Sequence, residues 1–92
     1  MANVCVFTAD GFEEIEGLTV VDLLRRAGAE VQMVSISDGL AVKGSHGIEL
    51  KADCFFDDVD YDTVDMLVLP GGMPGTRYLG EHQGLCGLLK NF

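Results

Sequence analysis

The sequence is poor in basic residues and contains no tryptophan. Only six lysines and arginines stand against fifteen acidic residues, which gives 92 residues a formal net charge of -9. The largest basic cluster is the pair Arg25-Arg26. Binding to a nucleic-acid backbone needs a basic surface that releases counterions. We therefore expect no nucleic-acid partner.

Long hydrophobic runs are missing as well. The apolar stretch at residues 4–7 is far too short for a signal h-region or a membrane span, and no basic n-region precedes it. We expect a cytoplasmic protein that has no membrane partner.

Cysteines are few and form no C-x-x-C pair. There are three cysteines, Cys5, Cys54 and Cys86. An odd number argues against a disulfide framework in a chain without a secretion signal. None has the neighbouring base or cation that would activate a thiol. The two histidines, His46 and His82, have no ligand-type residues at metal-binding spacing, so we expect no metal site.

The apolar and polar patterns that are present predict one α/β domain over residues 1–92. Residues 3–8 and 30–36 read as buried parallel strands on either side of an amphipathic helix at residues 12–27, which implies a right-handed βαβ unit. Residues 66–69 read as a third buried parallel strand. Residues 40–51 are expected to form an edge hairpin.

Two further segments complete the prediction. The acidic residues 57–65 read as a solvated loop or short helix, and helical spacing resumes at residues 78–89. No G-x-G-x-x-G follows the first strand and no P-loop lysine follows Gly75, so no nucleotide cofactor is expected.

The candidate site follows from the expected sheet. Ligands of open parallel sheets bind beyond the carboxyl ends of the strands, where strand order reverses. The first and third strands lead into residues 10–16 and 70–73, and these segments place a carboxylate cluster opposite a glycine-rich turn. We expect a binding site between them.

Glu16 is the strongest candidate within the carboxylate cluster. Acids in a first turn complement the helix dipole, which suffices to explain Glu13 and Glu14, with Asp10 and Glu13 arranged as a capping box. Glu16 lies deeper, beside the small Gly17, where a carboxyl could be partly buried and therefore protonated. Structural and functional interpretations of Glu16 are equally open.

Two other motifs have simpler structural interpretations. The pair Gly71-Gly72 could present backbone N–H groups to an oxyanion, although a strand-ending turn explains it more often. Ser45-His46 resembles a nucleophile with its base, but sequence neighbours in a glycine-flanked turn seldom have that geometry. We interpret them as turn residues.

Three segments together resemble the ThiJ/PfpI superfamily, in its parkinsonism-associated deglycase branch. These are GFEEIE at residues 11–16, VDLLRRAG at residues 21–28 and VLPGG at residues 68–72. The resemblance extends over nearly the whole chain and implies a flavodoxin-like parallel-sheet sandwich, incomplete in this chain. It also implies a homodimer and a reactive cysteine that lies beyond the residues present here.

The resemblance implies roles for individual residues. Glu16 matches the glutamate that hydrogen-bonds the reactive cysteine, Gly71 and Gly72 match the turn whose amides line the pocket, and Arg26 matches an arginine near the dimer contact. His46 stands where relatives often carry arginine.

The implied function is a cysteine-dependent, cofactor-free glyoxalase or protein deglycase acting on methylglyoxal, a related aldehyde or its glycated adducts. The nucleophilic cysteine is absent from this chain, so we expect the 92 residues alone to be inactive and to need a complementary C-terminal segment. Alternatives are a non-enzymatic redox sensor or chaperone of oxidative stress, a peptidase-like hydrolase, and a small flavodoxin-like binding module.

Overall fold

The computed structural model describes residues 2–37, 39–70 and 82–91. Its main sheet contains β1 (Asn3–Thr8), β2 (Glu30–Ser35), β5 (Cys54–Phe55) and β6 (Met66–Val68). The strand order is β5-β2-β1-β6, and every neighbouring pair is parallel. The helix α1 (Glu14–Arg26) connects β1 to β2.

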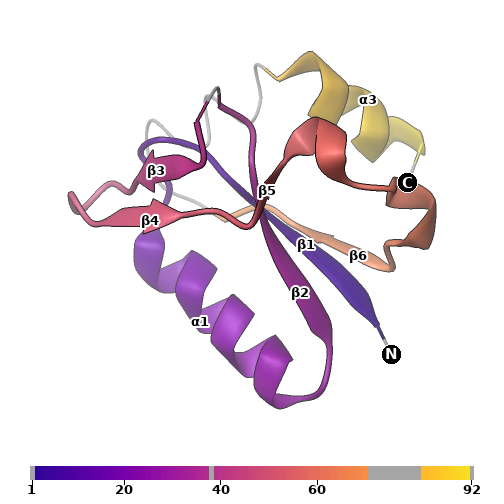
Figure 1. Cartoon of the computed structure of the whole chain (residues 1–92), viewed down its shortest axis with the longest axis horizontal. Coiled ribbons are helices and arrows are strands. Elements are labelled where there is room, and N and C mark those ends of the chain that lie inside the picture. The colour runs from indigo at the N-terminus through magenta and orange to yellow at the C-terminus, as the bar shows by residue number, and fades with distance from the viewer. Residues whose placement is uncertain (1, 38, 71–81, 92) are drawn as a thin grey trace.

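The remaining elements lie outside this sheet (Figure 1). Strands β3 (Ala41–Lys43) and β4 (Glu49–Lys51) form an antiparallel hairpin. Two short 3-10 helices, η1 (Phe56–Asp58) and η2 (Tyr61–Thr63), precede β6, and α3 (Gln83–Asn91) closes the described chain.

The strand predictions hold for the centre of the sheet. The first strand has the predicted bounds, and β1 lies between β2 and β6 as the proposed site requires. The hairpin was wrongly expected at the sheet edge, because it forms a separate two-stranded sheet. Strand β5 was not predicted, because a strand of two residues is too short to show a periodic pattern.

The sheet separates two hydrophobic clusters, which makes a three-layer arrangement. On the α1 face the cluster consists of Val4, Val6, Val21, Val31, Met33 and Ala52. On the α3 face it consists of Cys5, Phe7, Ala9, Val34 and Leu85. Because both faces of β1 and β2 are covered, these strands carry apolar residues in consecutive positions rather than in alternation.

The third predicted strand, residues 66–69, is less buried than expected. Met66 and Leu69 expose 49% and 44% of their surface. The reason is its place in the sheet, since β6 pairs with β1 on one side and forms the edge on the other within the described residues. None of the helices in the described part of the chain has the length and apolarity needed to cross a membrane.

The buried face of α1 is not the continuous apolar face that an amphipathic helix usually buries. The buried positions are Glu14, Gly17 and Val21, whereas Ile15 is 67% exposed and Leu18 lies at the surface. Residues three and seven positions apart share one helix face at 100° per residue. Glu14, which we expected only to complement the helix dipole, is therefore buried on the same helix face as Gly17 and Val21.

The first turn of α1 is also capped differently from the prediction. The helix begins at Glu14 and is capped by Glu13, whose side chain accepts a hydrogen bond from the N–H of Ile15 at 3.0 Å. The predicted capping box between Asp10 and Glu13 is not formed. Asp10 instead accepts from the backbone N–H of Lys43 on β3 at 3.1 Å. The loop after β1 is thereby joined to the hairpin.

Candidate functional site

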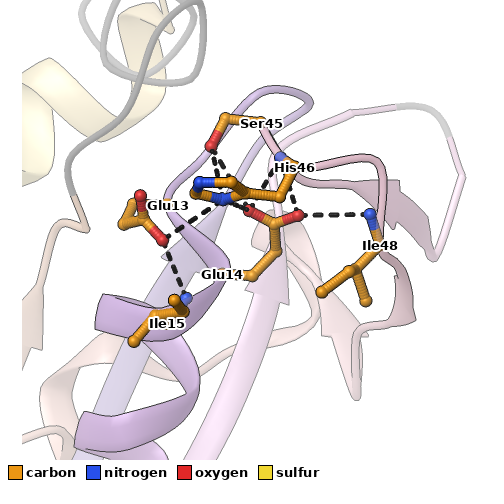
Figure 2. A network of polar contacts seen from close by, with 6 residues as sticks. All are labelled: Glu13, Glu14, Ile15, Ser45, His46 and Ile48. Carbon is orange, nitrogen blue, oxygen red and sulfur yellow. Dashed lines mark hydrogen bonds and ion pairs between the residues drawn. The ribbon is translucent and has the colours of Figure 1, made fainter.

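The start of α1 and the turn between β3 and β4 form one polar cluster at the carboxyl end of β1. Figure 2 shows His46 lying over the first residues of the helix, with Glu13 on one side and Glu14 beneath it. Two backbone hydrogen bonds join the same segments. The N–H of Gly11 donates to the carbonyl of Lys43 at 2.7 Å, and the N–H of Ser45 donates to the carbonyl of Phe12 at 2.9 Å. The cluster thus has a backbone frame.

Glu14 is the centre of this cluster and is completely buried. Its carboxylate accepts from the backbone N–H of His46 at 2.9 Å and from that of Ile48 at 3.2 Å. It also accepts from the hydroxyl of Ser45 at 3.3 Å, and its Oε1 lies 2.9 Å from Nδ1 of His46. These donors replace the water molecules that burial removes from the carboxylate.

Gly44 leaves the space that this carboxylate occupies. Gly44 is buried, and a Cβ built on it would overlap the carboxyl group of Glu14. Its backbone N–H donates to the carbonyl of Ile48 at 2.9 Å, which closes the turn around the carboxylate. The turn after β3 is therefore shaped to receive one specific side chain from the helix.

The pKa values follow from this arrangement. Burial by itself would raise the pKa of Glu14, but hydrogen bonds from its own N–H, the ring of His46, and the backbone N–H groups of Ile48 and His46 outweigh it and lower the pKa to about 2. The hydrogen bond to Glu14 raises the pKa of His46, and the charges of Glu13 and Glu14 raise it further against a smaller effect of burial.

These shifts predict a stability maximum at mildly acidic pH. The lowered pKa of Glu14 means that its contribution is present above its ordinary value of 4.5 and is lost as pH falls toward 2. The raised pKa of His46 means that its contribution is present below 6.5 and is lost as pH rises through the raised value. Urea unfolding midpoints measured across this range should peak between these limits.

The matched variant for this prediction is His46→Asn. It removes the titrating group of the alkaline limb and retains Glu14, so the alkaline decline should flatten while the acid decline remains. An alkaline limb that is unchanged in His46→Asn would show that another group causes it.

The cluster also brings together three residues that could ligate a metal, Glu13, Glu14 and His46, which the sequence spacing did not reveal. One atom each from Glu13, Glu14 and His46 lies within 4.8 Å of the others. The oxygens of Glu14 already accept hydrogen bonds from two backbone N–H groups, a hydroxyl and an imidazole, so a cation would have to displace these donors. The donor set therefore fits hydrogen bonding better than metal coordination.

The predicted site residue Glu16 has a different environment from the one expected. Glu16 is exposed, so Glu14 rather than Glu16 is the buried carboxylate of the first turns. Glu16 lines a hollow of about 470 Å³ together with residues of the end of β6. The other lining residues are Ile15, Thr19, Val20, Val68, Leu69 and Pro70.

This hollow lies where the sequence predicted a binding site between residues 10–16 and 70–73. Pro70 directly precedes Gly71 and Gly72, which lie outside the described residues. Glu16 and Pro70 line the same hollow, so α1 and the segment that leads into the glycine pair approach each other.

Arg26, the predicted dimer-contact residue, lies in the last turn of α1. Its Nε is 3.0 Å from Oδ1 of Asp22, one helical turn earlier, and both side chains are mostly exposed. An exposed pair of this kind contributes little to stability. Arg26 is thus at the molecular surface.

Two of the three cysteines, Cys5 and Cys54, lie in environments that disfavour the thiolate. Cys5 is buried in β1, and burial together with the nearby Cys54 raises its pKa to about 11. Burial and the charges of Asp53 and Asp58 raise the pKa of Cys54 as well. Neither thiol is activated for nucleophilic attack at neutral pH.

Sequence reasoning missed Glu14 and the role of the turn that binds it. One signal was available, because Glu14 lies seven residues before the buried Val21 and therefore on the same helix face. The partners of Glu14 are more than thirty residues away along the chain, at His46 and Ile48, and no local pattern links them.

The parallel sheet, the covering helices on both faces and the polar cluster at the carboxyl end of β1 define an α/β protein of the flavodoxin-like class. A profile of the DJ-1/PfpI family matches residues 2–92, and the chain belongs to this family. A solved structure of Toxoplasma gondii DJ-1 in its oxidized form superimposes with a TM-score of 0.94 at 40% identity. That superposition covers 99% of this chain and 50% of the other.

Two curated relatives show the same partial coverage. The dj-1beta protein of Drosophila melanogaster is 37% identical over 86 residues, which is 94% of this chain and 46% of the relative. A deglycase of Thermococcus kodakarensis is 41% identical over 70 residues, covering 76% of this chain and 42% of the relative. The chain therefore spans about half the length of these relatives.

Proposed function

We propose that this chain contributes one part of a cysteine-dependent, cofactor-free deglycase or glyoxalase that acts on methylglyoxal, a similar small aldehyde or its glycated adducts. Membership in the DJ-1/PfpI family and the relative named as a deglycase support the reaction class. The reactive cysteine is supplied by a complementary C-terminal segment, and the 92 residues alone have no turnover, in line with the raised thiol pKa values of Cys5 and Cys54.

The hollow between α1 and the end of β6 is the observation that carries this proposal. An exposed carboxyl, Glu16, stands at its rim, and the chain leaves the hollow at Pro70 toward Gly71 and Gly72. In the proposed site Glu16 donates a hydrogen bond to the thiolate, and the amides of the two glycines bind the oxyanion. Residues beyond the described ranges complete the pocket.

The complete protein is proposed to work as a homodimer in the cytoplasm. Arg26 lies at the surface, and Leu23, one helical turn earlier, is 60% exposed. This part of α1 therefore offers an apolar area suited to a subunit contact. Sedimentation of the protein at several concentrations tests this, with Arg26→Ala expected to shift the equilibrium toward monomer.

Substitution of Glu16 tests the catalytic proposal. With methylglyoxal as substrate, Glu16→Gln should retain much of the activity, because the amide can still donate a hydrogen bond to the cysteine. Glu16→Ala removes the donor and should lower kcat/KM by roughly 100-fold. Equal rates in the wild type and both variants would remove Glu16 from the mechanism.

A redox sensor or chaperone is the second candidate function, and the oxidized Toxoplasma gondii relative favours it. In that case the cysteine is oxidised rather than acylated. The protein would then show no turnover of methylglyoxal, and mild peroxide would add oxygen to one thiol in intact mass spectra.

A further inference from the structure

The imidazole of His46 is held in one tautomer by its neighbour. Nδ1 lies 2.9 Å from Oε1 of Glu14, and the carboxylate of Glu14 carries no proton near neutral pH because its pKa is about 2. A hydrogen bond between these atoms therefore requires the proton on Nδ1. The second ring nitrogen, Nε2, is left to gain and lose a proton as pH changes.

The same geometry excludes a serine nucleophile activated by this histidine. The hydroxyl of Ser45 lies 3.3 Å from Nδ1 and 3.3 Å from Oε1 of Glu14. A base must present a lone pair to the hydroxyl, but Nδ1 carries a proton that it donates to Glu14 and therefore has no lone pair to offer. Ser45 therefore donates to the carboxylate, and the reactive end of the imidazole is the opposite one.

That reactive end is accessible. The side chain of His46 is 55% exposed, while its partner Glu14 is 1% exposed. In Figure 2 the ring extends from the hairpin turn over Glu14 and toward Glu13. A ligand at the carboxyl end of β1 can therefore reach the exposed part of the ring without opening the cluster.

The charges around the ring come from α1. Glu14 lies beneath the ring and Glu13 is 3.5 Å from Nδ1, and both favour the imidazolium form. Asp10, in the loop before the helix, accepts a hydrogen bond from the backbone N–H of Lys43, and Ser45 in the turn itself is neutral. Titration of the ring is thus governed by two carboxylates at the start of one helix.

We propose that His46 is an acid–base group of the candidate site, positioned by the buried carboxylate of Glu14 and exchanging its proton through Nε2 with a bound carbonyl adduct. This inference rests on the proposed function. Nε2 takes one proton from an oxygen of the adduct and returns one proton to the adduct within the same turnover. The imidazole ends in its initial charge state, and the step needs no oxidant or reductant.

The variant His46→Asn separates this role from a structural one. The side-chain amide nitrogen of asparagine occupies the place of Nδ1 and can still donate to Glu14, but asparagine has no equivalent of Nε2. His82→Asn is the matched control, because Nδ1 of His82 accepts from the N–H of Leu85 at the start of α3 and asparagine is a good helix cap.

The experiment compares the three versions of the complete protein with methylglyoxal as substrate. His46→Asn should lower kcat/KM by about 100-fold and lose one limb of the pH profile. At a pH high enough for the wild-type ring to be neutral, it should keep the wild-type melting temperature, because the stabilising charge of His46 is then absent from both proteins. His82→Asn should leave kcat/KM and the pH profile unchanged. In the wild type, nitrogen-15 NMR of the neutral His46 ring should show the proton on Nδ1.

The outcomes are distinguishable. Wild-type kcat/KM and an unchanged pH profile in His46→Asn would overturn the acid–base role alone, as would a neutral ring that carries its proton on Nε2. A wild-type protein without turnover would overturn the proposed function and the acid–base role together.

Discussion

Replacement of Gly44 by alanine is expected to destabilise the protein strongly. The added methyl group would occupy the space of the buried Glu14 carboxyl, and neither the turn nor the first turn of α1 can move without breaking their shared hydrogen bonds. Overpacking of a well-filled interior costs roughly 1–3 kcal/mol. Thermal unfolding followed by circular dichroism should show a clearly lower melting temperature for Gly44→Ala.

Gly87→Ala provides the control for this effect. Gly87 lies within α3, and a Cβ built on it meets nothing within 4 Å. Alanine in a helix interior is favoured over glycine by about 1 kcal/mol. The control should therefore melt at the wild-type temperature or above it. Equal melting temperatures for Gly44→Ala and the wild type would mean that Glu14 does not fill the turn.

Glu14→Ala is expected to have the second large effect. The backbone N–H groups of His46 and Ile48 would lose their acceptor inside the protein, and the imidazole of His46 would lose its partner. Buried donors without partners are costly, and the substitution also leaves a cavity. We expect the melting temperature to fall by on the order of 10 °C, with faster hydrogen exchange at the amides of His46 and Ile48.

Glu49→Ala is the matched control, because it removes an exposed glutamate from β4 of the same hairpin. Its effect on the melting temperature should be small, as for most surface substitutions. Glu14→Gln is also informative, since its amide group would direct hydrogens toward backbone donors and should restore only part of the stability. A Glu14→Ala protein as stable as Glu49→Ala would contradict the central role of this carboxylate.

The elements of the sheet could be predicted because their signals are local. Residues 3–8 and 30–36 are apolar on both faces, and only a strand covered on both sides accommodates that pattern. Gly28, which follows the helix with a φ of 90°, marked the end of α1 equally well. By contrast, β5 has only two residues, and its pairing with β2 depends on the whole chain.

The candidate site divides in the same way. The sequence by itself determined that carboxylates follow β1 and that the chain belongs among α/β proteins. Only the tertiary structure decided which carboxylate is buried, because burial depends on the rotation of α1 against the sheet. That rotation brings Glu14 to Gly44 and His46, which lie thirty or more residues away, and leaves Glu16 exposed beside Pro70. Hydrogen bonds between such distant segments depend on how the elements pack together, and a local periodic pattern in the sequence does not reveal them.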